Sequence, residues 1–359
     1  VLMLGAVLDA VRDKPGSDLE LVVFALPSFA VAHPELAGRL EVVTAPVDGA
    51  SKIRRVAAEN TWLPRAARRA GIGLMHHAGG VLPVGDRGPA TVTIHDLQPL
   101  DLPDNFSAVK QRYLSLTLGP SARRARLTAV PSEFTRSRVI ERLGAAADRV
   151  SVVPWAVPPL LSADSASSPE APLPASVRRP YALYPAITYP HKNHLVLLEA
   201  FASLAEAEEL QLVLIGGAGA SEAAVLDRMA ANDLRDRVVR LGRVPSAVRT
   251  ALIGNAAMVV VPSRYEGFGL PALEAMAAGV PVIVSDIPAL AEVVAATAPR
   301  VGVDDVAGWC TAIGLLAADG PRRAELSAAG LTEAAAFTPQ RTAAAMIDVW
   351  QRAAATTTS

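Results

Sequence analysis

The sequence predicts an α/β protein built from two doubly wound domains, each with a parallel sheet between layers of helices. Three observations support this fold class. The chain has 359 residues, more than one ordinary hydrophobic core accommodates. Short runs rich in valine and leucine alternate with helical patterns, as parallel strands joined by right-handed crossovers do. Residues 158–179 interrupt this alternation with proline, serine and alanine in no periodic order, which is typical of an interdomain linker.

The linker sets the predicted domain boundaries. Residues 1–157 form the first Rossmann-like domain, and residues 180–337 form the second. Residues 338–359 follow as a terminal helix with a frayed tail. Each of the two domains then has the usual size for a single core.

Composition narrows the function classes. Hydrophobic residues make up 51% of the chain and aromatic residues only 4%, which favours layered α/β packing over an aromatic binding platform. The net charge of −1 gives no reason to expect a nucleic-acid partner. The single cysteine, Cys310, leaves no internal disulfide framework, in keeping with a cytoplasmic location. No apolar run reaches the roughly 18 residues of a membrane span.

The first half alternates strands and helices from its start. The pattern predicts helices over 1–13, 51–70 and 107–125, a turn over 14–18, and strands over 19–26, 40–44, 72–76, 91–94, 127–130 and 149–153. His77 follows one strand, and His95 and Asp96 follow the next. Polar residues at carboxyl ends of strands point into the crevice where α/β enzymes place their chemistry. The His95–Asp96 pair is equally explained by a local cap, and Ser132 is expected to cap the following helix.

The helix over 51–70 has a basic face. It carries Arg54, Arg55, Arg65, Arg68 and Arg69. A basic face is more often simply solvated, but it can also hold a protein to an anionic membrane. Peripheral contact with the inner face of the membrane therefore stands beside the solvated alternative.

The second half repeats the alternation. Strands are expected over 181–184, 211–215, 238–241, 258–262 and 281–285, and helices over 246–253, 271–278, 304–318, 322–336 and 338–355. A further helix follows His191, Lys192 and Asn193 and is expected to turn Leu195, Leu198 and Phe201 inward. A lysine at a helix entrance opposes the helix dipole unless it shares an anion, so Lys192 is a candidate phosphate ligand.

Two glycine turns are candidate ligand contacts. Gly216 and Gly217 follow strand 211–215, where such a turn either approaches a ligand or only permits close packing. Gly267 and Gly269 follow strand 258–262 and precede a helix that begins near Pro271. The free N–H groups of that helix are expected to face the carboxyl edge of the sheet, where doubly wound folds bind phosphates.

Two glutamates frame the second turn. Glu266 lies within it, and Glu274 lies about one turn inside the helix. They could offer acceptors to sugar hydroxyls on either side of a phosphate, or both could be solvated as most glutamates are. Asp286 is expected to cap a further short helix.

The whole stretch resembles the signature of the retaining GT-B glycosyltransferases of family 4. In that family two glutamates separated by seven residues flank Gly-Phe-Gly and a proline, matched here by Glu266, Gly267, Phe268, Gly269, Leu270, Pro271 and Glu274. The strings YPAITYPHKNHLVLLEAF, LVLIGG, VVRLGRV and SDIPALAEV are also similar, and IHDLQPL and TAVPSEFTRSRV resemble the family more loosely. The resemblance implies two Rossmann-like domains facing each other across a cleft, with the last helix crossing back to the first domain.

The resemblance also implies roles for particular residues. Lys192 and the backbone from Gly267 to Leu270 would contact the donor pyrophosphate, Glu274 the ribose and Glu266 the transferred sugar. The remaining donor-side residues would be Phe268, Gly269, His191, Asn193, Gly216, Gly217, Arg243 and Val244, with the base near Gly216, Arg243 and Val244. His95 and Asp96 would position the acceptor hydroxyl, with His77 and Ser132 on the acceptor side. No metal and no cofactor are expected.

The chain departs from the family in two places. Thr188 to His191 occupy the interval where an arginine often assists the lysine, so His191 and the helix dipole are expected to compensate in part. Family members begin with a strand and a glycine-rich loop, whereas this chain opens with the helix that follows them. We therefore expect a vacant central position in the first sheet, and low stability or activity of the chain as it stands.

The expected reaction is retaining, metal-independent transfer of a hexose, with mannose from GDP-mannose favoured, to a saccharide or lipid-linked saccharide. A UDP- or dTDP-sugar donor is the first alternative. A related GT-B reaction such as phosphorolysis and a catalytically weak nucleotide-binding partner are the others.

Overall fold

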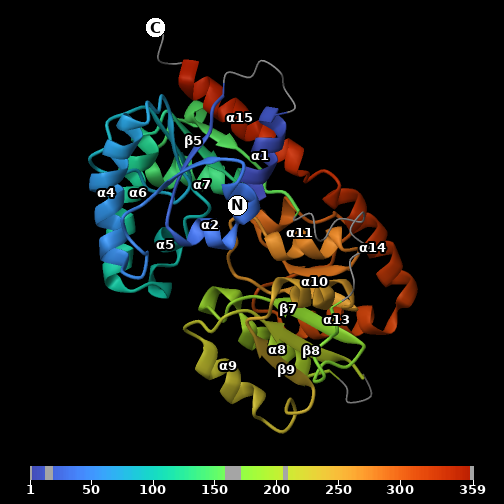
Figure 1. The fold of residues 1–359 in the computed structure, drawn as a ribbon. Helices are drawn as coiled ribbons and strands as arrows, with labels where there is room; N and C mark the ends of the chain where they lie inside the picture. The colour runs from blue at the N-terminus through green and yellow to red at the C-terminus, as the bar shows by residue number, and fades with distance from the viewer. Residues whose placement is uncertain (1, 13–18, 158–170, 205–208, 356–359) are drawn as a thin grey trace.

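A computed structural model describes residues 2–12, 19–157, 171–204 and 209–355. The predicted turn 14–18 and most of the predicted linker, residues 158–170, lie outside these described residues. Two lobes are visible, one built from the first half of the chain and one from the second (Figure 1). All strand pairs are parallel, and helices cover the sheets, so the predicted α/β fold class is confirmed.

The second half contains a six-stranded sheet in the order β12-β11-β10-β7-β8-β9. Its strands are β7 (Tyr181–Pro185), β8 (Gln211–Ile215), β9 (Val238–Gly242), β10 (Met258–Val261), β11 (Val282–Ser285) and β12 (Arg300–Val301). Its helices are α8 (His194–Ala202), α9 (Glu222–Met229), α10 (Ser246–Gly254), α11 (Leu270–Ala277), α12 (Pro288–Ala291), α13 (Val306–Ala318) and α14 (Gly320–Ala334). The central strands are buried along their whole length, which explains their unbroken apolar runs.

The first half divides its strands between two sheets within the described residues. β1 (Val22–Ala25) pairs with β2 (Glu41–Thr44), and the other sheet has the order β3 (Met75–His77), β4 (Ala90–Thr93), β5 (Leu127–Val130) and β6 (Val150–Val152). Its helices are α1 (Leu2–Arg12), α2 (Ser28–Ala32), α3 (Pro34–Ala37), α4 (Lys52–Arg69), α5 (Gln98–Asp101), α6 (Ala108–Arg124) and α7 (Glu133–Leu143).

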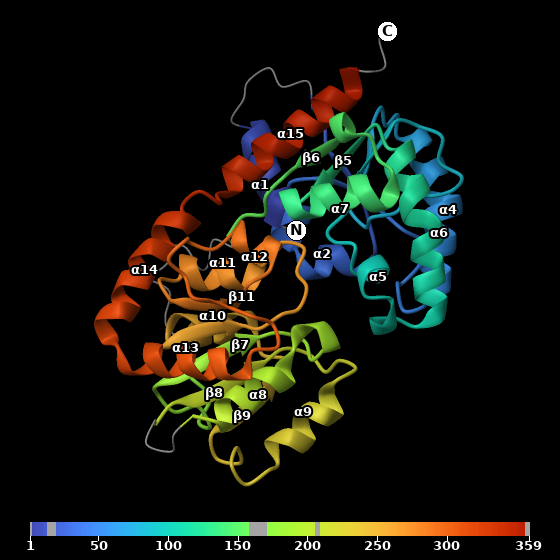
Figure 2. The same cartoon turned by 180° about the vertical axis from the view of Figure 1, so that it is seen from behind.

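The last helix, α15 (Pro339–Ala355), packs on the first half, against α1 and the sheet that contains β5 (Figure 2). Met346 and Trp350 share a small core with Val7 and Ala129. The Trp350 ring also lies 5.5 Å from the ring of His76. The two ends of the described chain therefore stabilise the same lobe.

Two local predictions are wrong. Leu195 on α8 is 41% exposed, whereas Leu198 and Phe201 of the same helix are buried as predicted. α12 begins at Pro288 after Ile287, which leaves Asp286 too far from its first turn to cap it.

Trp350→Ala should destabilise the protein by about 3–5 kcal/mol, because a large buried ring leaves a cavity between α15 and the first lobe. Urea unfolding measures the loss. The exposed neighbour change Gln351→Ala is the control and should cost little. A loss below about 1 kcal/mol for Trp350→Ala would show that α15 is not anchored by this ring.

Candidate functional site

The loop between β10 and α11 carries the first of the two glutamates. Gly269 has φ +102°, a conformation that L side chains rarely adopt, and it ends the loop at the start of α11. A Cβ atom on Gly267 would lie 2.2 Å from the carbonyl oxygen of His95, which belongs to the first half. Both positions therefore require glycine. Gly269 is required by its backbone conformation, and Gly267 is required because the two halves meet there.

Lys192, from the turn after β7, forms an ion pair with Glu266 of this loop. The Lys192 Nζ atom lies 2.6 Å from Glu266 Oε1, and the two side chains are only 17% and 10% exposed. The hydroxyl of Tyr184 donates to the backbone carbonyl of Lys192 at 2.7 Å, which holds the turn that carries the lysine. Burial, and secondarily the Glu266 charge, raise the pKa of Tyr184, so its hydroxyl stays protonated. The structure thus brings together the two residues predicted to be central.

Asp96 approaches the same pair from the first half. Burial raises its pKa and the Glu266 charge adds to the rise, while the N–H of Gln98, His95 and Lys192 oppose it. The Gln98 N–H donates to Asp96 Oδ1 at 2.9 Å. Asp96, Glu266 and Lys192 therefore lie within electrostatic reach of one another across the two halves.

His95 is exposed beside Asp96. Its Nε2 lies 2.8 Å from the carbonyl oxygen of Ala78, and its ring lies 5.3 Å from that of Trp155. The ring is oriented by these two contacts, both on the first-half side of the site.

Glu274 is buried and paired. Arg249 of α10 donates from Nη1 to Glu274 Oε1 at 3.0 Å and from Nη2 to the other carboxylate oxygen. The solvated alternative for Glu274 is therefore wrong. Arg249 belongs to no motif in the sequence, and its role was missed because it lies on a different helix.

His191 cannot supply the positive charge expected of it. Its ring is buried, and burial followed by the Lys192 charge lowers its pKa to about 4. The ring is neutral at pH 7 and stacks on Tyr189. His191 therefore offers no charge at pH 7 to replace the missing arginine, and its part in donor binding stays a prediction.

Two other residues predicted on the donor side, Asn193 and Phe268, direct their side chains into contacts within the protein. Asn193 adopts φ 57° and donates from Nδ2 to the carbonyl oxygen of Val303 at 2.6 Å. Phe268 packs between Trp155 and Phe337, with ring centroids 5.8 and 5.7 Å away. Both side chains serve packing, which leaves only their backbone groups for a ligand.

The other glycine turn, after β8, is tightly packed. Gly216 has φ +127°, and a Cβ there would lie 2.3 Å from the carbonyl oxygen of Ala186. A Cβ on Gly217 would lie 2.8 Å from Nε of Arg243, whose side chain is exposed. Val244 packs against the core of the second half. Close packing alone explains the two glycines, while Arg243 stays open to a ligand.

The two residues predicted on the acceptor side are both engaged. His77 is buried with Nε2 3.6 Å from Asp86 Oδ2, and burial lowers its pKa more than Asp86 raises it. Ser132 caps α7 by accepting from the Thr135 N–H at 3.1 Å, as predicted, and donates to the carbonyl oxygen of Gly267 at 2.7 Å. His77 is thus buried within the first half, whereas Ser132 lies at the junction of the halves.

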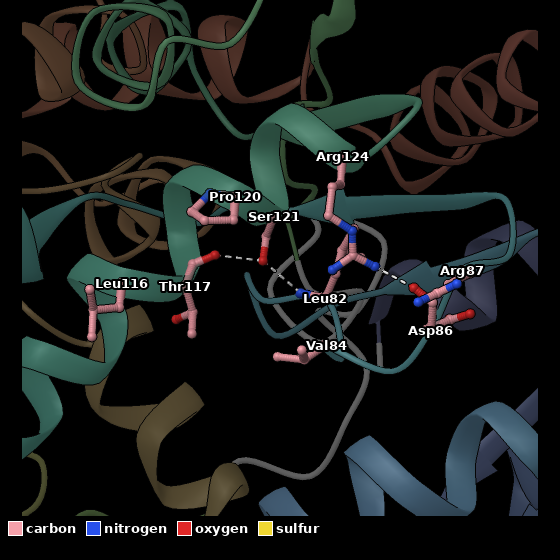
Figure 3. Close-up of a pocket in the computed structure, with 9 residues that line it drawn as sticks. All are labelled: Leu82, Val84, Asp86, Arg87, Leu116, Thr117, Pro120, Ser121 and Arg124. Carbon is pink, nitrogen blue, oxygen red and sulfur yellow. Dashed lines mark hydrogen bonds between the residues drawn. The ribbon is translucent and has the colours of Figure 1, made fainter.

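An open pocket of about 660 Å³ lies elsewhere, between α6 and the segment before β4 (Figure 3). It is lined by Leu82, Val84, Asp86, Arg87, Leu116, Thr117, Pro120, Ser121 and Arg124. Arg124 donates to the carbonyl oxygen of Asp86, and Ser121 accepts from the Leu82 N–H at 2.9 Å. None of these lining residues belongs to the Lys192–Glu266 site.

The depressed pKa of His191 predicts a pH effect on stability. The unfolded chain binds a proton near pH 6.5 and the folded ring only near pH 4, so stability is lost as pH falls through this window. At pH 5 the loss from this side chain should be about 2 kcal/mol. His191→Gln should therefore lose about that much less than the wild type in urea unfolding between pH 7 and pH 5. An identical loss in both proteins would contradict the assignment.

Comparisons with known proteins agree with this fold. The family model described as Glycosyl transferases group 1 matches residues 170–330, and the one described as Glycosyltransferase Family 4 matches residues 15–159. The structure of Alr3699/HepE from Anabaena in complex with UDP and glucose superimposes with a TM-score of 0.72 at 18% identity, covering 98% of this chain and 95% of that one. That likeness concerns the fold.

Two relatives are similar in sequence. The O-antigen chain mannosyltransferase B of Escherichia coli is 34% identical over 215 residues, which are 57% of this chain and 55% of that protein. The O-antigen chain mannosyltransferase RfbU of Salmonella typhimurium is 28% identical over 225 residues, which are 62% and 59% of the two chains. The chain thus spans little more than half the length of these relatives. With both family models matched in order along the two lobes, the chain belongs to the family 4 glycosyltransferases of the GT-B fold.

Proposed function

We propose that this protein transfers a hexose from a nucleotide-diphosphate sugar to a saccharide or lipid-linked saccharide. The observation that carries the proposal is the nearly buried Lys192–Glu266 pair beside the N-terminus of α11. A cation and a helix N-terminus on one side of a carboxylate suit a ligand that has both phosphates and hydroxyls. Glu274 lies on the same helix, is held by Arg249, and is proposed to receive the ribose.

The proposed chemistry follows from where charge develops. As the bond between the anomeric carbon and the phosphate oxygen breaks, negative charge grows on the leaving nucleotide, and the Lys192 ammonium and the α11 amides stabilise it. The incoming phosphate competes with Glu266 for Lys192, which frees the carboxylate to accept from sugar hydroxyls. The acceptor oxygen bonds to the same face of the carbon, and its proton passes to the leaving phosphate oxygen. Retention and independence of metal ions are both part of the proposal.

The donor is proposed to be GDP-mannose. Two similar proteins are named mannosyltransferases, which supports mannose. UDP and glucose are named with the similar Alr3699/HepE structure, so a UDP-sugar is the alternative, with a dTDP-sugar after it. Arg243, which is exposed beside Gly217, is proposed to contact the base.

Glu266→Gln and Lys192→Ala should each lower transfer by about a hundredfold or more, because each removes a charge from the site where charge develops. Nucleotide release from GDP-, UDP- and dTDP-sugars, with and without saccharide acceptors, measures the effect. Glu199→Gln is the matched control, since it breaks the ion pair with Arg228 on the surface of the same half. Its rate should match the wild type.

The same assay separates the alternatives. Tight nucleotide binding without release of sugar from any donor would indicate the catalytically weak binding partner. Release that requires inorganic phosphate would indicate phosphorolysis. Full transfer by Glu266→Gln would refute the role proposed for this residue.

Peripheral contact with an anionic membrane is proposed for the outer face of the first half. Within the part of the chain that the structure describes, no helix combines the length and apolar character needed to cross a bilayer. The arginines of α4 predicted on its basic face are all exposed, and so is Ile53 beside them at 83%. Leu116 and Val84, at the rim of the α6 pocket, are 64% and 78% exposed on the same half. Cationic and apolar groups on one half suit a lipid surface.

Removing two of these charges in Arg54→Gln/Arg69→Gln should weaken binding to vesicles that contain phosphatidylglycerol by roughly 30-fold, at about 1 kcal/mol for each charge. Vesicle flotation measures this. Arg235→Gln/Arg300→Gln removes two exposed arginines from the second half and should leave binding unchanged. Equal losses in both variants would contradict a specific role for α4.

A further inference from the structure

The first half holds the loop that carries Glu266 through contacts to the residues on either side of it. The first of these contacts involve Tyr265, the residue before Glu266. The hydroxyl of Tyr265 accepts from the backbone N–H of Leu97 at 3.1 Å and donates to Asp101 Oδ2 at 3.1 Å. Asp101 is itself held by Arg138 of α7, which donates to both of its carboxylate oxygens. Tyr265 thus contacts both ends of the short helix α5 of the first half, its N-cap Leu97 and its last residue Asp101.

Gly267, the residue after Glu266, also contacts the first half. The carbonyl oxygen of Gly267 accepts from the hydroxyls of Ser132 at 2.7 Å and Thr135 at 3.0 Å. On its other side Gly267 lies against the carbonyl of His95, so close that a side chain would not fit. Glu266 therefore lies between Tyr265 and Gly267, which are both hydrogen-bonded to the opposite half.

A third contact joins the halves next to this loop. Glu292, which follows α12, accepts from the backbone N–H groups of Glu133 and Phe134 at 2.8 and 2.6 Å. These are among the unpaired N–H groups of the first turn of α7, where a carboxylate is favoured. The Phe134 ring also meets the Tyr265 ring edge to face, 5.8 Å between centroids. The N-terminus of α7 therefore takes all its partners in this region from the second half or from its own cap, Ser132.

We propose that a clamp formed between the two halves positions Glu266. The clamp is defined as Asp101, Ser132 and Thr135 together with Tyr265 and Glu292, and its members are positioning residues for Glu266. The Glu266–Lys192 pair then takes its working geometry only when the two halves are closed on each other. The proposal rests on the function proposed above in assigning Glu266 to the transferred sugar.

The clamp has a consequence for the acceptor side. Leu97, which holds Tyr265, directly follows His95 and Asp96, the residues predicted near the acceptor hydroxyl. A shift of this segment when an acceptor binds would move Tyr265 and Gly267, and with them Glu266. Donor and acceptor sites are therefore coupled through one short segment.

Tyr265→Phe tests the clamp, because it removes only the hydroxyl and keeps the ring. Backbone amide exchange, followed by mass spectrometry, should become at least tenfold faster in residues 264–269 and stay unchanged in β10. The kcat for transfer should fall at least tenfold, with the KM for the donor changing much less. Tyr181→Phe is the matched control: its hydroxyl donates to the Leu252 carbonyl within the second half, so it should alter neither measurement.

Each outcome decides the proposal. Unchanged exchange in residues 264–269 would overturn the clamp. Faster exchange with a wild-type kcat would overturn the positioning role. If the wild-type protein turns over no donor, the proposed function fails, and the exchange rates still decide whether the first half holds this loop.

A second variant, Glu292→Gln, should speed exchange in the first turn of α7 as well, and failure to do so would remove Glu292 from the clamp.

Discussion

The nearly buried pair of Lys192 and Glu266 is the constraint on which the site depends. A lone charge at this depth would be strongly unfavourable, and each side chain is stable there because the other lies 2.6 Å away. The backbone must therefore deliver both residues to one point, the lysine from the turn after β7 and the glutamate from the loop after β10. These strands are neighbours in the sheet, so their carboxyl ends meet at the same edge.

The meeting of the two halves imposes the second constraint. Gly267 lies against the His95 carbonyl, and its own carbonyl is bonded to Ser132 and Thr135. A loop this close to another lobe cannot carry a side chain at that position, which gives a physical reason for the glycine beyond its flexibility. It also means that the shape of the donor-side loop is partly set by residues of the acceptor-side half.

Several motif residues turn out to serve packing. Phe268 fills the junction between Trp155 and Phe337, Asn193 holds the Val303 carbonyl, and His191 is neutral and buried. A sequence motif that resembles a binding signature therefore contains both candidate ligand-contacting residues and residues that support the backbone. The motif alone does not distinguish the two kinds of residue. Burial and hydrogen-bond partners do separate them.

The sequence by itself determined the parallel α/β architecture, the order of the elements, the glycine turn before α11 and the placing of Lys192 and Glu266, because each follows from short-range patterns of apolar, glycine and capping residues. Arg249 beside Glu274, Tyr265 against Leu97 and Asp101, and the withdrawal of His77 toward Asp86 were decided only by the tertiary structure. These contacts join side chains from separate elements, and no local pattern records which surfaces will meet when the lobes pack together.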